Sequence, residues 1–179
     1  SIGSGFFVSA DGLIVTNFHV ASQLALEPER YSGAYVTIDG QEGAVELLAF
    51  DVQRDLAVLR AKNRTASAPV LEFRPAAEAM AQGERIYSLG NPLDIGFAVT
   101  EGTYNGLVRR SFYPRIFFGG ALNPGMSGGP AVDDAGRVLG VNVAKRLDGE
   151  QVSFLIPAEF AQALVQRAAH AQPITQPAY

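Results

Sequence analysis

The chain has no cysteine and only two histidines, His19 and His170. Disulfide bonds and a cysteine nucleophile are therefore excluded. Zinc sites in proteins are built from clusters of cysteine, histidine and carboxylate ligands. Two histidines far apart in the sequence, with no cysteine beside them, do not form such a cluster. The sequence therefore predicts no zinc site.

Long apolar runs and excess positive charge are also missing. No apolar stretch approaches the ~20 residues that a membrane-spanning helix needs, so no membrane span is expected in this chain. The formal net charge is −4 and the pI is about 5.2. A nucleic-acid partner usually requires a basic face, so this class of function is disfavoured. A length of 179 residues with 47% hydrophobic residues suits one domain or two closely packed subdomains.

Short strand-like segments separated by turn signals dominate the sequence. Asp11-Gly12 and Asp39-Gly40 each lie between two such segments, a pattern typical of a β-hairpin. Regular short strands of this kind predict an all-β barrel or sandwich. A proline- and alanine-rich passage over residues 69–83 predicts the crossing between two halves. Helical spacing of apolar residues predicts a helix over residues 158–171, followed by a flexible tail over 172–179.

The segment Asn123-Pro124-Gly125-Met126-Ser127-Gly128-Gly129-Pro130 places one serine among glycines. Glycines adopt backbone conformations that other residues avoid. The serine hydroxyl can then be exposed while nearby N–H groups converge on one point, as acyl transfer requires. Two other interpretations are weighed. The nucleophile elbow of an α/β-hydrolase would continue into a helix, whereas here a strand-like segment follows. A purely structural glycine-rich turn stays open.

A serine nucleophile needs a base and a group that orients the base. His19 follows an apolar, strand-like run, and Asp55 directly precedes another. The order histidine, aspartate, serine is that of the chymotrypsin-like arrangement. Asp51 is the rival orienting residue. His170 lies near the end of the predicted C-terminal helix and receives no chemical role.

The chain resembles the protease domain of HtrA-type, trypsin-like serine peptidases. Seven matching motifs, in the order of the family, carry this resemblance: Gly3-Ser4-Gly5-Phe6, Thr16-Asn17-Phe18-His19-Val20, Asp55-Leu56-Ala57-Val58-Leu59, Leu89-Gly90-Asn91-Pro92, Asn123–Pro130, Gly140-Val141-Asn142-Val143-Ala144 and Phe154-Leu155-Ile156-Pro157.

The resemblance implies two six-stranded antiparallel β-barrels and a C-terminal helix. It assigns residues 1–75 to a barrel with His19 and Asp55, and residues 76–157 to a barrel with Ser127. It implies endopeptidase activity on polypeptides, in protein quality control or regulated proteolysis, without a cofactor. His19 would act as general base and then acid, Asp55 would orient it, and Ser127 would be the nucleophile. The backbone N–H groups of Gly125 and Ser127 would form the oxyanion hole.

The resemblance also implies a specificity pocket walled by Leu122, Ala144 and Lys145. This pocket predicts a small or medium aliphatic residue before the scissile bond, and not arginine. Lys145 stands where the family usually has an apolar residue, so it would extend to solvent or attract an acidic side chain. A bacterial periplasm or cell envelope is the location that the family favours. Since HtrA-type relatives are often trimers, a homo-oligomer is a further expectation.

Met126 departs from the family, which usually has asparagine or aspartate at this position. A thioether cannot form an ion pair with a freed N-terminal amine. It also cannot stabilise the loop by hydrogen bonds as a polar side chain would. This departure keeps a second function open: a peptide-binding pseudo-protease, or a partner-activated switch whose oxyanion loop rests in an inactive form.

Overall fold

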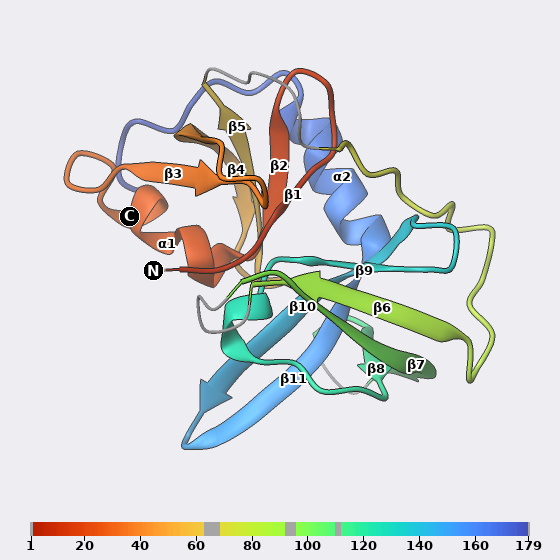
Figure 1. The fold of residues 1–179 in the computed structure, drawn as a ribbon. Coiled ribbons are helices and arrows are strands. Elements are labelled where there is room, and N and C mark those ends of the chain that lie inside the picture. The colour runs from red at the N-terminus through yellow and green to blue at the C-terminus, as the bar shows by residue number, and fades with distance from the viewer. Residues whose placement is uncertain (1, 63–68, 92–95, 110–111, 179) are drawn as a thin grey trace.

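The computed structural model describes residues 2–62, 69–91, 96–109 and 112–178. Pro92, which belongs to one of the family motifs, lies outside them. The first half of the chain forms a five-stranded antiparallel sheet (Figure 1). Its strands lie in the order β1 (Phe6–Phe7), β2 (Leu13–Thr16), β5 (Leu56–Ala61), β4 (Glu42–Asp51) and β3 (Gly33–Val36).

The second half of the chain forms a closed, six-stranded antiparallel barrel. Its strands close in the order β10 (Val138–Leu147), β11 (Glu150–Pro157), β8 (Arg115–Phe118), β7 (Ala98–Val108), β6 (Arg85–Gly90) and β9 (Pro130–Val132). The turn and strand pattern of the sequence predicts two strands here, over residues 97–100 and 103–108, whereas β7 is one continuous strand. The register of β7 with β8 shifts between Tyr104 and Leu107, where Gly106 has a φ of 95°.

The expectation of two closed barrels is met only in the second half. In the described part of the chain the first sheet stays open, because its edge strands β1 and β3 each pair on one side only. β1 has two residues and β3 has four, so neither edge offers a long ladder for closure. The coarse architecture is therefore mostly β, with one half-barrel sheet, one closed barrel and a C-terminal helix.

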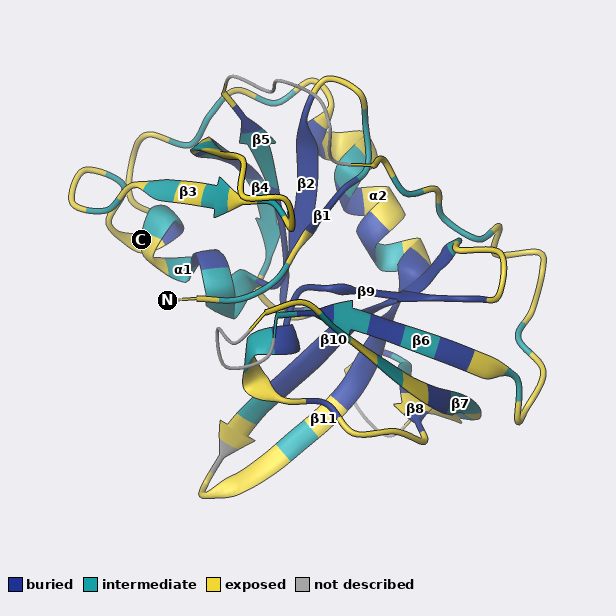
Figure 2. Cartoon of the chain, viewed as in Figure 1, coloured by how far each residue is buried: buried dark blue, intermediate teal, exposed yellow. Residues whose placement is uncertain are grey.

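A shared apolar core joins the two halves. Val15 and Leu56 of the first sheet lie in the same cluster as Val141 and Val143 of the barrel, together with Leu164 of the C-terminal helix. That helix, α2 (Ala158–Ala168), is shorter than the predicted 158–171. Figure 2 shows α2 with alternating buried and exposed residues, as expected for a helix that packs one face on the core.

The tail beyond α2 contacts the first half of the chain. The Ile174 N–H donates to the Leu47 carbonyl over 2.8 Å, and the Ala178 N–H donates to the Ala25 carbonyl over 2.9 Å. Both side chains pack against the cluster under α1 (Phe18–Leu26). The sequence predicts a flexible tail here, and the structure places it against the first sheet instead. No helix of the described ranges has the length and apolarity to cross a membrane.

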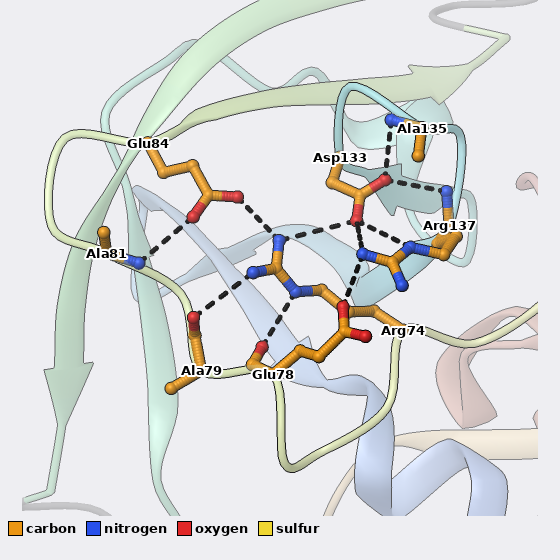
Figure 3. Close-up of polar contacts among 8 residues, drawn as sticks. All are labelled: Arg74, Glu78, Ala79, Ala81, Glu84, Asp133, Ala135 and Arg137. Carbon is orange, nitrogen blue, oxygen red and sulfur yellow. Dashed lines mark hydrogen bonds and ion pairs between the residues drawn. The ribbon is translucent and has the colours of Figure 1, made fainter.

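A network of charged side chains fixes the passage between the halves (Figure 3). Arg74 Nη1 lies 2.6 Å from Glu84 Oε2 and 3.4 Å from Asp133 Oδ2. Asp133, in the turn after β9, also accepts hydrogen bonds from the N–H groups of Ala135 and Arg137. The hydrogen bond from Arg74 is the main cause that lowers the pKa of Glu84 below its ordinary value. The network therefore ties the passage to the second barrel.

Candidate active site

His19 and Asp55 are joined by two hydrogen bonds at one end of the first sheet. His19 lies in the first turn of α1, directly after β2, and Asp55 immediately precedes β5. The Asp55 Oδ2 atom lies 2.7 Å from Nδ1 of the imidazole, and Oδ1 accepts the His19 backbone N–H over 2.8 Å. Such a carboxylate fixes the ring orientation and the tautomer that carries its proton on Nδ1. Asp51, the rival, instead pairs with Arg54.

Asn17 holds Asp55 in an uncommon backbone conformation. Asp55 has a φ of 56°, in the left-handed region that non-glycine residues seldom adopt. The fully buried Asn17 donates a side-chain hydrogen bond to the Asp55 carbonyl over 2.9 Å. Sequence reasoning gave Asn17 no role, although it belongs to the histidine motif. The signal that could have found it was its position two residues before a candidate base.

The Ser127 hydroxyl is bound to the backbone of β10. Ser127 is fully buried, and its Oγ donates to the Ala144 carbonyl over 2.7 Å while it accepts the Ala144 N–H over 2.9 Å. Among the described residues, no hydrogen bond joins Ser127 to His19. The structure therefore brings His19 and Asp55 together, whereas the hydroxyl of Ser127, the third predicted residue, is hydrogen-bonded to the Ala144 backbone of β10.

The loop before Ser127 forms a short 3-10 turn, Pro124–Met126. The Ser127 N–H, predicted to serve the oxyanion hole, donates to the Pro124 carbonyl over 3.1 Å. The Gly125 carbonyl accepts a hydrogen bond from the hydroxyl of Ser4 over 2.7 Å. Ser4 had no assigned role in the sequence. In this geometry one of the two predicted oxyanion donors is already engaged within the loop.

Close backbone packing places the serine loop against the segment that carries His19. The Ser4 N–H donates to the Ser127 carbonyl over 2.8 Å. Gly128 has a φ of 89°, and a Cβ atom built there would lie 2.2 Å from the Ser4 carbonyl oxygen and 2.3 Å from Thr16 Oγ1. Only glycine allows this approach. The serine loop of the second half thus packs directly against Ser4 and Thr16 of the first half, just before the start of α1.

Residues 3–141 match the trypsin-like peptidase domain. The chain belongs to this family. A protein named "Probable periplasmic serine endoprotease DegP-like", from Bartonella henselae, is 35% identical over 93% of this chain and 33% of its own length. "Protease Do-like 1, chloroplastic", from Arabidopsis thaliana, is 30% identical over 98% of this chain and 41% of its own length. The chain thus spans less than half of either relative.

Solved structures of the trypsin-like peptidase family resemble this one across most of the chain. The crystal structure of Deg5 superposes with a TM-score of 0.77 at 27% identity, over 92% of this chain and 81% of Deg5. The HtrA-type protease AlgW, solved with a decapeptide, gives a TM-score of 0.80 at 28% identity, over 94% of this chain and 52% of AlgW. The predicted relationship to HtrA-type proteases is confirmed.

Two of the three residues that the sequence predicts for a specificity pocket are buried here. Leu122 and Ala144 are each 2% exposed and belong to the barrel core, together with the fully buried Met126. The thioether of Met126 lies 3.9 Å from the hydroxyl of Thr100, its one recorded polar contact in the described chain. The third residue, Lys145, neither joins this core nor extends freely to solvent. Its Nζ lies 3.5 Å from Asp55 Oδ2.

Proposed function

We propose that this chain is the catalytic domain of a serine endopeptidase of the HtrA type. The observation that carries the proposal is the pair of hydrogen bonds between His19 and Asp55. A carboxylate-oriented imidazole next to a serine is the arrangement that activates a hydroxyl nucleophile. Within the proposal, residues 1–75 and 76–157 are the two halves of a chymotrypsin-like fold, and the first sheet corresponds to its first barrel.

The proposed reaction needs two rearrangements of the described geometry. The Ser127 hydroxyl leaves the Ala144 backbone and turns toward His19 Nε2, which takes its proton as Oγ attacks the peptide carbonyl. Asp55 stabilises the imidazolium that forms, and His19 then gives the proton to the leaving amine. The oxyanion requires the N–H groups of Gly125 and Ser127, so the hydrogen bond from Ser127 to Pro124 must open first.

A partner-activated switch is a second candidate function, and one observation favours it. The N–H of Ser127 is engaged by Pro124 within its own loop, and its hydroxyl is engaged by the Ala144 backbone of β10. A ligand that shifts this equilibrium must bind the rearranged form more tightly than the resting one. The same domain would then cleave peptides only with that ligand. The two candidates differ in the state of one loop.

Labelling with a fluorophosphonate separates these candidates. Rapid labelling of Ser127 by the chain alone is the expected result for a competent endopeptidase, and Ser127→Ala abolishes it. Ser32→Ala, at an exposed serine away from the loop, is the matched control and labels at the wild-type rate. Labelling that needs an added polypeptide supports the switch. If Ser127 stays unlabelled with every denatured protein substrate that is added, the result contradicts both the competent endopeptidase and the partner-activated switch.

The specificity pocket yields a prediction about the residue before the scissile bond. We expect cleavage after small or medium aliphatic residues, because Leu122 fills space where a deep pocket would lie and no aspartate is offered at its base. Mass-spectrometric identification of cleavage sites in an unbiased peptide library measures the preference. A dominant arginine or lysine at that position refutes this assignment of Leu122, Ala144 and Lys145.

The location and assembly of the protein are also part of this proposal. Relatives from Bartonella henselae, Chlamydia pneumoniae and Hahella chejuensis are named as periplasmic serine endoproteases. These names support a periplasmic or cell-envelope location, whereas a role in protein quality control or regulated proteolysis is proposed on the family resemblance alone. A homo-oligomer is proposed on the family resemblance and is measured by analytical ultracentrifugation.

A further inference from the structure

The Asp55 carboxylate has two ion-pair partners among the described residues, His19 and Lys145. Both contact the same oxygen: His19 Nδ1 lies 2.7 Å from Oδ2, and Lys145 Nζ lies 3.5 Å from it. The Asp55 side chain is 8% exposed and that of Lys145 is 33% exposed. The lysine therefore approaches a nearly buried carboxylate from the solvent side.

Strand β10 places Lys145 at this position. Successive side chains of a strand point to opposite faces, so Ala144 and Lys145 diverge. Ala144 packs in the barrel core, and its backbone holds the Ser127 hydroxyl. Lys145 extends from the barrel to Asp55, which belongs to the other half of the chain. Two adjacent residues of one strand thus contact both the proposed nucleophile and the proposed orienting carboxylate.

The other charged and titratable groups near Asp55 are already engaged. Arg54 pairs with Asp51 at 3.0 Å, and Arg115 lies over the rings of Tyr113 and Phe154. Burial is the main cause that raises the pKa of Tyr113; the charge of Arg115 opposes it, and those of Asp55 and Asp51 add to it. The charge of Asp55 thus acts on the buried phenol of Tyr113. The ammonium of Lys145 is the cation in contact with the Asp55 carboxylate.

We propose that Lys145 is a positioning residue of the active site, whose ammonium binds the carboxylate that orients His19 and opposes formation of the imidazolium. The inference rests on the proposed serine endopeptidase chemistry. In the transition state His19 becomes positively charged, and a second cation on the same carboxylate raises the energy of that state.

Replacement of the charge tests this role. In Lys145→Met, which keeps an unbranched apolar chain, we expect the rate of fluorophosphonate labelling at alkaline pH to rise about two- to fivefold, the range for one partly exposed charge pair. The acid side of the pH–rate profile moves to higher pH, because loss of a nearby cation favours the protonated imidazole. Lys145→Arg keeps the charge, so the midpoint of its pH–rate profile should stay at the wild-type pH. Lys62→Met, at the other lysine of the chain, is the matched control and changes neither.

A titration by NMR tests the same coupling without catalysis. The chain has two histidines, so the ring signals of His19 are resolved against those of His170 as an internal reference. We expect the titration midpoint of His19 to move to higher pH in Lys145→Met and to stay in place in Lys145→Arg. If this shift occurs in a chain that never labels, the electrostatic coupling of Lys145 to His19 stands, while the endopeptidase proposal and the catalytic consequence of that coupling fail. If labelling occurs but neither profile moves in Lys145→Met, or both variants lose activity alike, the lysine role is overturned.

Discussion

Replacement of Ser127 by alanine is expected to lower peptide hydrolysis by about 10⁵–10⁶-fold, the scale found when a serine protease loses its nucleophile. The methyl group cannot form an acyl-enzyme, and what remains comes from substrate binding and oxyanion donors alone. Hydrolysis of casein, followed by release of acid-soluble peptides, measures the loss. A variant that cleaves casein at the wild-type rate removes Ser127 from the mechanism.

The same substitution also reports on the resting position of the hydroxyl. In the described geometry Ser127→Ala leaves the N–H and the carbonyl of Ala144 without their buried partner. Loss of a buried partner costs about 1–3 kcal/mol, so we expect the free energy of unfolding to fall by that amount while the fold persists. Ser127→Cys, which keeps a weak donor, should lose less. A Ser127→Ala chain as stable as the wild type would show that the hydroxyl does not rest on β10.

The pairing of His19 with Asp55 could be expected from sequence because each residue borders a strand of one sheet. Thr16, the last residue of β2, pairs with Ala57 near the start of β5, so residues just outside these ends meet at one edge. The resting position of Ser127 could not be expected in this way. It depends on Ala144, which lies 17 residues further along the chain, and on small backbone rotations in a glycine-rich loop.

The open first sheet and the bound tail were also beyond the sequence signals. Turn residues and alternation predict that strands exist, but closure depends on the length and pairing of the edge strands β1 and β3. The tail has two prolines and little periodicity, which favours a flexible segment. Its two backbone hydrogen bonds to Leu47 and Ala25 are long-range contacts that no local pattern encodes. The contact of Lys145 with Asp55 is of the same kind.

Asp133 is the residue of the charged network whose loss we expect to destabilise the fold most. Its side chain is 5% exposed, and Oδ2 lies 3.2 Å from Arg137 Nη2 and 3.4 Å from Arg74 Nη1. Oδ1 accepts the N–H groups of Ala135 and Arg137 over 2.9 and 3.0 Å. Without this carboxylate Arg74 and Arg137 keep Glu84 and Glu78 as partners, but the two backbone N–H groups lose their acceptor, at a cost of about 1–3 kcal/mol. We therefore expect Asp133→Ala to lower the free energy of unfolding by that amount.

Urea denaturation followed by far-UV circular dichroism measures this effect, and two variants separate its causes. Asp133→Asn keeps an oxygen that can accept the two backbone N–H groups but loses the charge, so its loss should fall between those of the wild type and Asp133→Ala. Asp134→Ala changes the exposed neighbour in the same turn and should stay within about 0.5 kcal/mol of the wild type. Arg74 lies in the passage between the halves, and Asp133 lies in the barrel. Loss of their contact should couple the two halves less tightly, so we expect the urea unfolding transition of Asp133→Ala to be broader than that of the wild type. Equal stability of Asp133→Ala and Asp134→Ala would show that the Asp133 carboxylate adds no net stability beyond that of Glu84 and Glu78, the other partners of the two guanidinium groups.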